Sequence, residues 1–193
     1  QVSDLSPLAR LPALTDLILS GNQISDLSAL AGLLTLRNLQ LSNNQISDIA
    51  PLAGLIYLGG LHLSSNQISN ISPLSGLINL TSASLDDNQI SNIGPLVNNP
   101  GLGQDDLINL RTNPLNWDSV HTYIPQLQAR GVNVQWDTSN QLPNQPTNAS
   151  PTNGATGVSL TPTLQSSVFS DPDAGDEHAA SEWQITTASG NYA

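Results

Sequence analysis

The sequence predicts an α/β-type repeat solenoid in which short parallel β-strands alternate with turns and 3₁₀ segments. The first observation is the motif Asn-Gln-Ile-Ser, which recurs every twenty-two residues and begins at Asn22, Asn44, Asn66 and Asn88. The second is a frame of leucines and isoleucines that recurs with the motif. A fixed period of this length is typical of solenoids, in which each coil packs only on its neighbours. We therefore expect residues 1–137 to form one stack of coils.

A short strand is expected just before each motif. The two aliphatic residues that precede the motif are two positions apart, as are Leu39 and Leu41 before Asn44. Alternation of this kind is typical of a strand with one buried face. Because the pattern repeats in every coil, the strands should pair side by side into a parallel sheet whose remaining side chains point outward.

The opposite side of each coil is expected to hold a 3₁₀ turn. Leu27, Leu30 and Leu33 follow one another at intervals of three, which suits this tighter helix. Asp26 precedes them, and an acid or amide at this position can accept a backbone N–H as a helix cap. Most coils also carry a proline in the first turn, where its missing N–H is no loss.

The repeated asparagine itself is best interpreted as structural. Its short amide can bond the turn backbone of adjacent coils and thereby satisfy buried N–H and C=O groups where the chain leaves the strand. A ligand-binding role for this residue is the less favoured interpretation, because a ladder of identical amides already explains it.

The run from Leu58 to Leu74 reads L-x-x-L-x-L-x-x-N-Q-I-S-N-I-x-P-L, with Asn70 where an aspartate is usual. This run resembles the bacterial leucine-rich repeats of the internalin type, and the resemblance extends over about 110 residues. It implies an extracellular or cell-surface bacterial module that binds proteins through its concave sheet. It brings no catalytic residues with it.

The regular period ends after the fourth motif. The next turn asparagine is Asn113, twenty-five residues after Asn88, so three residues are inserted near 101–106. Beyond it an amphipathic helix is expected from the i, i+3, i+4, i+7 spacing of Val120, Tyr123, Ile124 and Leu127.

The residues at both ends of this segment are typical of helix ends, but a proline lies inside it. Asn116 is expected to cap its start and Gly131 to follow its end. Pro125 should kink the helix or split it near Thr122. A short edge strand is expected at 132–136, and residues 101–137 resemble the helical C-terminal cap of bacterial leucine-rich repeat proteins.

The remainder of the chain has a different composition. Residues 138–154 are rich in Asn, Gln, Pro and Thr, which predicts a linker. Residues 155–193 resemble the start of a bacterial Ig-like or fibronectin-like domain, with strands near 154–164 and 181–186. Such a β-sandwich needs about 100 residues, so a truncated segment is expected. The repeat register reaches Gln1, which favours a piece of a longer protein whose signal sequence lies outside it.

Composition excludes several functions. The chain has four arginines, no lysine and fifteen acids, giving a net charge of −11, which disfavours nucleic acid and anionic membrane surfaces. No apolar run is long enough for membrane insertion. The absence of cysteine removes disulfides, zinc–thiolate sites and thiol catalysis.

No catalytic constellation is visible, so we expect no enzyme activity in these residues. His62, His121 and His178 are far apart in the sequence, and no hydrolase or phosphate-binding motif is present. The acidic pairs 86–87 and 105–106 follow and precede neighbouring strands and would form a metal site only if they approached one another. We favour solvated turns there.

One acidic cluster in the tail is similar in composition to a calcium site. Asp171, Asp173 and Asp176 could supply carboxylate oxygens to a hard cation. The spacing differs from that of an EF-hand, and a polar loop between strands is the favoured interpretation. No other cofactor is expected.

The outward side chains of the predicted sheet are the expected partner-binding face. The residues are Asp16, Ile18, Asn38, Gln40, His62, Ser64, Ser84, Asp86, Asn109 and Arg111. We expect a protein ligand; a glycan is less favoured because the face has no aromatic side chain. Two alternatives are a rigid spacer in a multidomain extracellular stalk and an accessory domain of an enzyme whose catalytic domain lies elsewhere.

Overall fold

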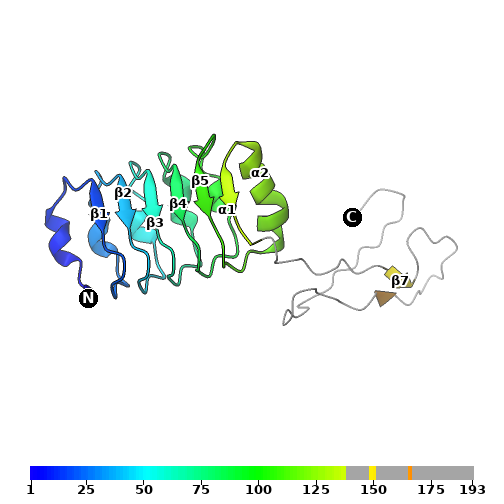
Figure 1. Ribbon diagram of the computed structural model, residues 1–193, viewed down its shortest axis with the longest axis horizontal. Helices are drawn as coiled ribbons and strands as arrows, with labels where there is room; N and C mark the ends of the chain where they lie inside the picture. The colour runs from blue at the N-terminus through cyan, green and yellow to red at the C-terminus, as the bar shows by residue number, and fades with distance from the viewer. Residues whose placement is uncertain (138–147, 151–164, 167–193) are drawn as a thin grey trace. The chain divides into compact units, whose positions relative to one another are not determined.

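The computed structural model describes residues 1–137, 148–150 and 165–166. Residue contacts divide the chain into one unit that spans Gln1–Asp137 and a second that spans Thr138–Ala193. The first unit is the predicted stack of coils, each with one strand on the same side (Figure 1).

The strands of the first unit form one parallel sheet in chain order. Its six strands are β1 (Asp16–Ile18), β2 (Asn38–Gln40), β3 (Gly60–His62), β4 (Ser82–Ser84), β5 (Leu107–Asn109) and β6 (Asn133–Gln135). Neighbouring strands pair with a strict register, so that Leu39 lies beside Leu61 and Leu61 beside Ala83. The predicted parallel sheet is confirmed, and β6 extends it into the C-terminal cap.

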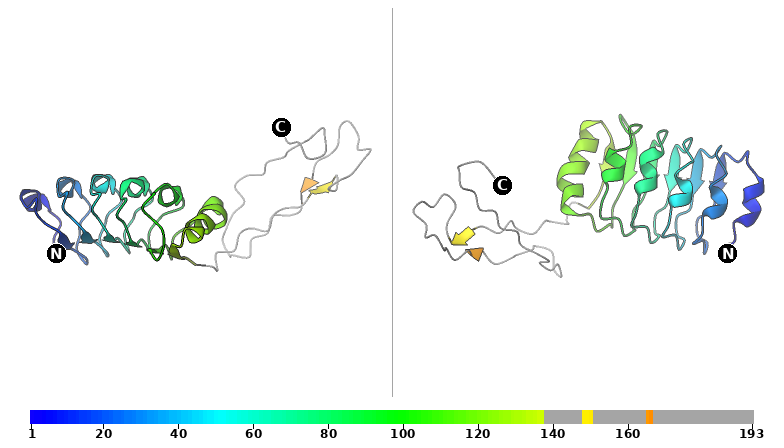
Figure 2. Two further views of the ribbon diagram at one scale, coloured as in Figure 1. Left: turned by 90° about the horizontal axis from the view of Figure 1, so that it is seen from above. Right: turned by 180° about the vertical axis from the view of Figure 1, so that it is seen from behind.

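The opposite side carries one short helix per coil (Figure 2). The helices are η1 (Ser6–Arg10), η2 (Ser28–Leu30), η3 (Ala50–Leu52), η4 (Ser72–Gly76) and α1 (Gly94–Val97). The first four are 3₁₀ helices, as predicted, and α1 is a single α-helical turn.

The acid or amide binds the first backbone N–H of each helix as predicted, but it stands one residue before the N-cap, which is Leu27 in η2. Asp26 Oδ1 accepts the backbone N–H of Ser28, the first residue of η2, at 2.8 Å. The same bond is made in the other coils by Asp4, Asp48, Asn70 and Asn92. The hydrogen bond from the backbone N–H of Ser28 lowers the pKa of the Asp26 carboxyl, and the Ser28 hydroxyl adds to this effect.

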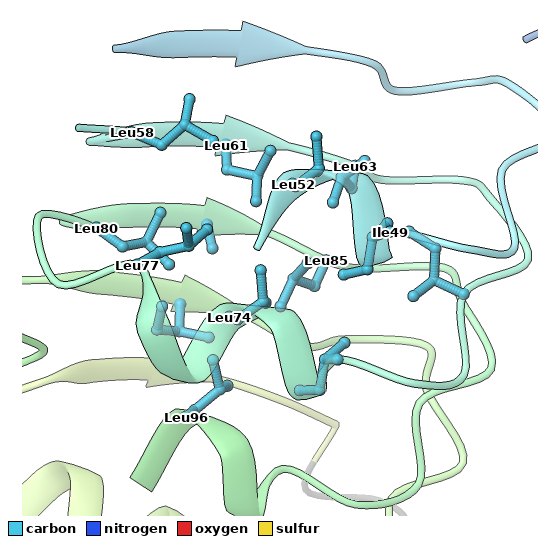
Figure 3. Packing of buried hydrophobic residues seen from close by; sticks show 14 of the residues in the cluster. Ile49, Leu52, Leu58, Leu61, Leu63, Leu74, Leu77, Leu80, Leu85 and Leu96 are labelled. Atoms are coloured by element: carbon cyan, nitrogen blue, oxygen red, sulfur yellow. The ribbon is translucent and has the colours of Figure 1, made fainter. Parts of the chain in front are cut away.

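The core is a continuous column of aliphatic side chains between the sheet and the helices (Figure 3). Leu58, Leu61 and Leu63 of the third coil and Leu74 and Leu85 of the fourth coil are fully buried members of this column. Burying a leucine side chain is worth about 2 kcal/mol, so each coil contributes several such increments. Stacking shields both faces of a coil, which one coil alone could not do.

The repeated asparagine forms a ladder along one edge of the sheet. Asn66 Nδ2 donates to the carbonyl of Leu63 in its own coil at 3.0 Å and to that of Leu41 in the preceding coil at 3.1 Å. Its Oδ1 accepts the N–H of Ile46 at 3.0 Å. The pattern is repeated by Asn44, Asn88 and Asn113. The structural interpretation of the asparagine is confirmed.

The residue before each ladder asparagine adopts the left-handed conformation. It is Gly21 in the first coil, with φ 74°, but Asn43, Ser65, Asp87 and Thr112 in the others, with φ between 54° and 58°. Asparagine tolerates this region, whereas a β-branched threonine is strained there. Among these turns the backbone strain is therefore greatest at Thr112.

The last coil breaks the aliphatic column with a buried amide. Asn99 occupies the position of Leu33, Leu55 and Leu77 in earlier coils and is fully buried. Its Nδ2 donates to the carbonyls of Leu74 and Leu77 at 2.8 and 2.9 Å, and its Oδ1 accepts the N–H of Gly101 at 2.8 Å. The amide thereby starts the inserted loop.

Glycine is required where that loop meets the preceding coil. A Cβ on Gly101 would lie 1.9 Å from the carbonyl oxygen of Ile78, which no side chain can accommodate. This close contact lets the longer fifth coil stay in register with the fourth despite its three additional residues.

The cap helix is continuous and contains a π turn. It comprises η5 (Ser119–Tyr123), which is π-helical, followed by α2 (Ile124–Ala129). The prediction that Pro125 kinks or splits the helix near Thr122 holds in part: the helix changes from π-helical to α-helical after Tyr123 but continues without a break. Asn116 Oδ1 accepts the N–H of Ser119 at 2.9 Å and Gly131 has φ 88°, so both predicted ends are confirmed.

The cap helix is fastened to the last coil by two polar side chains. Arg130 Nη1 donates to the carbonyl of Val97 at 2.8 Å, and Nη2 donates to those of Asn99 and Leu102. Ser119 is fully buried; its Oγ donates to the carbonyl of Ser91 at 2.8 Å. These contacts close the hydrophobic end of the stack.

In the second unit the structure describes one antiparallel pair, β7 (Asn148–Ser150) with β8 (Gln165–Ser166). β7 lies inside the segment expected to be a linker, so three of its residues belong to a strand. The strands predicted near 154–164 and 181–186, with the Ig-like interpretation that depends on them, lie outside the described residues.

Candidate protein-binding face

The outward side chains of β1–β6 and of the residues that follow each strand form three rows, which we call the sheet face. The first row is Asp16, Asn38, Gly60, Ser82, Leu107 and Asn133. The second is Ile18, Gln40, His62, Ser84, Asn109 and Gln135. The third is Ser20, Ser42, Ser64, Asp86 and Arg111, aligned by backbone bonds between adjacent coils.

All ten residues predicted for this face lie on it. The parallel register places residues twenty-two apart side by side, which is why the sequence period was sufficient to find them. Asn133 and Gln135 also lie on the face but were not predicted for it, because β6 was expected only to close the stack. The sign that could have revealed them is the alternation of Val132, Val134 and Trp136 around them.

The first two strands hold a fixed carboxylate. Asp16 Oδ1 accepts a hydrogen bond from Asn38 Nδ2 at 2.6 Å, and its Oδ2 accepts one from Thr15 Oγ1 at 2.7 Å. The Thr15 hydroxyl and then the Asn38 amide lower the pKa of the Asp16 carboxyl, and the charge of Arg37 acts in the same direction. Asp16 is therefore an ionised acceptor in a set orientation.

The central strands are linked across the sheet by side-chain hydrogen bonds. Asp86 Oδ1 accepts from Ser64 Oγ at 2.7 Å and from Asn109 Nδ2 at 2.9 Å. In the next row His62 Nδ1 lies 3.1 Å from Ser84 Oγ. Each pair joins residues of adjacent coils, so these side chains are positioned before any partner arrives.

Two large apolar side chains and one arginine of the face are open to solvent. Ile18 is 71% exposed, although it is a large aliphatic residue, and Leu107 is 37% exposed. Arg111 is also exposed, at the end of the third row. Arginine and large apolar side chains are the types that anchor protein interfaces, whereas the small polar residues between them mainly provide complementarity.

The face offers little for catalysis. His62 and Ser84 are the residue types of a nucleophile and its base, but no carboxylate is hydrogen-bonded to His62 in the described part of the chain. His121 is remote from this pair on the cap helix, where its ring stacks on Trp117 with centroids 4.7 Å apart. The described residues bring no catalytic set together.

The two acidic pairs do not approach one another. Asp86 follows β4 and Asp106 precedes β5. In a parallel pair they therefore lie at opposite ends of the two strands, about 17 Å apart. Asp106 is largely buried and accepts the N–H of Gly103 at 2.8 Å, a loop contact. Within residues 1–137 no three potential metal ligands converge.

The calcium-like cluster of the tail, Asp171, Asp173 and Asp176, lies outside the described residues. None of the helices in the described part of the chain is long and apolar enough to cross a membrane.

Comparison with known proteins identifies the repeats. Residues 34–76 match the family model described as Leucine Rich repeats (2 copies). No curated protein matches the chain. Among solved structures, internalin C2 of Listeria monocytogenes is 33% identical, with a TM-score of 0.61 over 70% of this chain. The internalin InlF of the same organism is 31% identical, with a TM-score of 0.60 over 70% of this chain.

A third structure supports the fold alone. The leucine-rich repeat protein LIC12759 of Leptospira interrogans is 24% identical, with a TM-score of 0.62 over 70% of this chain. The match covers 57%, 39% and 34% of the three solved chains, so this chain corresponds to about half of each or less. Residues 1–137 therefore form an internalin-like leucine-rich repeat solenoid.

Proposed function

We propose that the chain is a non-catalytic protein-interaction module of a larger bacterial surface or secreted protein, and that its partner binds across the sheet face. The observation that carries this proposal is the registration of three rows of side chains over six strands, with hydrogen bonds from coil to coil. Such a face loses little conformational freedom on binding, which favours association. Solenoids commonly use this surface for binding.

The size of the face sets the expected affinity. Six strands about 4.8 Å apart span roughly 24 Å, and three rows about 7 Å apart add roughly 15 Å in the other direction. The resulting few hundred Å² are below the roughly 800 Å² per partner of a standard interface. We therefore expect weak binding by this segment alone, with Ile18 and Arg111 as its anchors.

Surface location or secretion is supported by similarity. Two solved structures that are more than 30% identical to this chain, internalin C2 and InlF, are both internalins. The net charge of −11 is consistent with a protein ligand and unfavourable for nucleic acid.

The test is a capture experiment with matched variants. Immobilised chain is exposed to biotinylated surface proteins of bacterial and animal cells, and the retained proteins are identified by mass spectrometry. A partner should be lost with Ile18→Asp combined with Arg111→Glu. It should be retained by Ala53→Glu, an exposed position beside η3 on the opposite side. A partner that is retained by the double variant would contradict binding through the sheet face.

A second candidate function is a rigid spacer in an extracellular stalk. It is favoured by the many side chains of the face that bond one another and so leave few free groups. If Ile18→Ala, His62→Ala and Arg111→Ala together leave adhesion of the bacterium unchanged while the solenoid stays folded, the spacer is the better account.

A further inference from the structure

A row of large aliphatic side chains lies outside both the core and the sheet face. Leu34, Ile56 and Ile78 occupy the same position of three consecutive coils, four residues before the strand, and we call them the apolar stripe. They are 54%, 43% and 49% exposed, whereas the leucine just before each of them is fully or almost fully buried. Hydrophobic exposure repeated at one position is not required by the stack.

The stripe is held in register by contacts between coils. Asn79 Nδ2 donates to the carbonyl of Ile56 at 2.7 Å, and Gly101 packs directly against the carbonyl of Ile78. The corresponding residue after Leu34 in the second coil, Thr35, donates to the carbonyl of Pro12 at 2.8 Å. The three side chains therefore repeat at the coil spacing, about 4.8 Å.

An aromatic residue and an arginine flank the stripe. Tyr57 follows Ile56 and is 50% exposed, and the guanidinium carbon of Arg37 lies 5.7 Å from the centre of its ring. Tyrosine and arginine are typical of interface hot spots. Together the stripe and Tyr57 present roughly 350 Å² of half-exposed side chain, the size of patch that is often functional.

Charge distinguishes this edge from the rest of the molecule. In the first four coils, the segments that run from three residues before the stripe position to three after it contain Arg10 and Arg37 and no acid. The chain as a whole carries a net charge of −11. An acidic partner would meet Arg10 and Arg37 at this edge, although Asp16 of the sheet face lies close enough to Arg37 for the arginine to lower the pKa of its carboxyl.

We propose that the apolar stripe is a second docking surface, and that it binds an acidic amphipathic helix lying across the coils. A helix presents apolar side chains once per turn, every 5.4 Å, which departs from three rungs at 4.8 Å by only about 1.2 Å in total. The alternate residues of an extended strand are about 6.7 Å apart and would be out of register by about 4 Å. Glutamates beside the apolar face of the helix would meet Arg37.

A second copy of this chain fits the stripe less well. A stable dimer needs about 800 Å² on each partner, more than twice what the stripe and Tyr57 offer. The proposal is independent of binding at the sheet face, because the two surfaces share no residue.

The experiment uses the full chain with methyl-labelled leucine and isoleucine and a stapled helical peptide. The peptide has leucines at i, i+4 and i+7, flanked by glutamates. Saturable shifts of the Leu34, Ile56 and Ile78 methyl signals are expected. The triple variant Leu34→Ser, Ile56→Ser, Ile78→Ser should weaken binding about tenfold or more. Ile18→Ser, the same change on the sheet face, should leave it unchanged.

Charge reversal sharpens the test. Arg37→Glu should weaken binding of the glutamate peptide and improve binding of a lysine-flanked version. Equal binding of a scrambled peptide or of a peptide with leucines at alternate positions would overturn the proposal. So would an equal loss with Ile18→Ser, or a dimer that dissociates in the triple variant. Unchanged thermal unfolding of each variant shows that the fold is retained, and absence of any binding by the folded wild type rejects the docking surface.

Discussion

In the regular coils, residues 1–98, one asparagine per coil satisfies the backbone at the turn. The closing segment, residues 99–137, keeps this asparagine at Asn113 but adds side chains that occur once. Asn66 links three backbone groups of two coils, and its equivalents do the same. In the closing segment Asn99 and Arg130 bind carbonyls that no periodic residue reaches. Backbone groups that are buried in every coil are satisfied by a residue that repeats in every coil. Backbone groups that are buried only in the closing segment need side chains that occur once.

The largest effect that would test this comparison is expected within the ladder. Asn88→Ala should lower the free energy of unfolding by about 3 kcal/mol, because buried groups of Leu63, Leu85 and Ile68 lose their partners. Asn22→Ala should cost about 1 kcal/mol, since Asn22 is more exposed and donates only within its own coil. Urea unfolding of both variants measures the difference, and equal losses would refute a ladder that strengthens by stacking.

The next largest effect is expected at Arg130, whose contacts with three carbonyls we call the clasp. Arg130→Met should cost about 2 kcal/mol, because three carbonyl acceptors lose their donor while the apolar stem is kept. Arg111→Met, on the exposed sheet face, should change the unfolding free energy by less than about 0.5 kcal/mol. The same urea titrations compare the two. A clasp variant as stable as the control would show that the cap is held by its apolar contacts alone.

A stabilising change is predicted at the strained turn. Thr112 has φ 55°, a conformation that Asn43 adopts in the second coil at φ 58°. Thr112→Asn should therefore raise the free energy of unfolding by about 0.5–1 kcal/mol, and Asn43→Thr should lower it similarly. Thermal unfolding monitored by circular dichroism reads out both changes. Shifts of the same sign in the two variants would contradict the assignment of strain.

The smallest expected effect is a pH dependence in the exposed caps. The pKa of the Asp26 carboxyl is lowered, first by the backbone N–H of Ser28, so its stabilising contact is complete above about pH 4 and is lost as the pH falls through the lowered pKa. In the fourth coil Asn70 makes the same bond without a charge. Asp26→Asn should therefore match the wild type at pH 7 and be relatively more stable near pH 2. Urea midpoints that differ by the same amount at both pH values would argue against this linkage.

Much of the fold could be predicted from the sequence, because each coil repeats the same residue types at the same spacing and makes the same contacts. The strand, the 3₁₀ turn with its cap, and the bonds of Asn66 all follow from spacing and residue type. The role of Asn99 does not, although the interruption of a leucine column is a signal that could have found it. Nothing in the sequence indicates that Arg130 reaches three carbonyls, because that depends on how the inserted loop folds.

Some features of the sheet face could likewise be predicted from the sequence, and others could not. Alternation along a strand fixes which residues face outward, so the positions of Ile18 and Arg111 could be predicted. The hydrogen bonds that Asp86 makes to two neighbours depend on rotamers that a linear pattern does not specify. The exposure of Ile56 depends on the path of the loop before the strand. An isoleucine at this position would be expected in the core.

Hydrogen exchange at single amides of the ladder tests the central claim most directly. The N–H groups of Ile46 and Ile68 donate to the side chains of Asn66 and Asn88. They should exchange as slowly as the sheet N–H of Leu63, which donates to the carbonyl of Ser84 at 2.8 Å. In Asn66→Ala the N–H of Ile46 should exchange faster while that of Ile68 stays protected. Fast exchange of both in the wild type, or no change at Ile46 in the variant, would contradict a stack held by its asparagines.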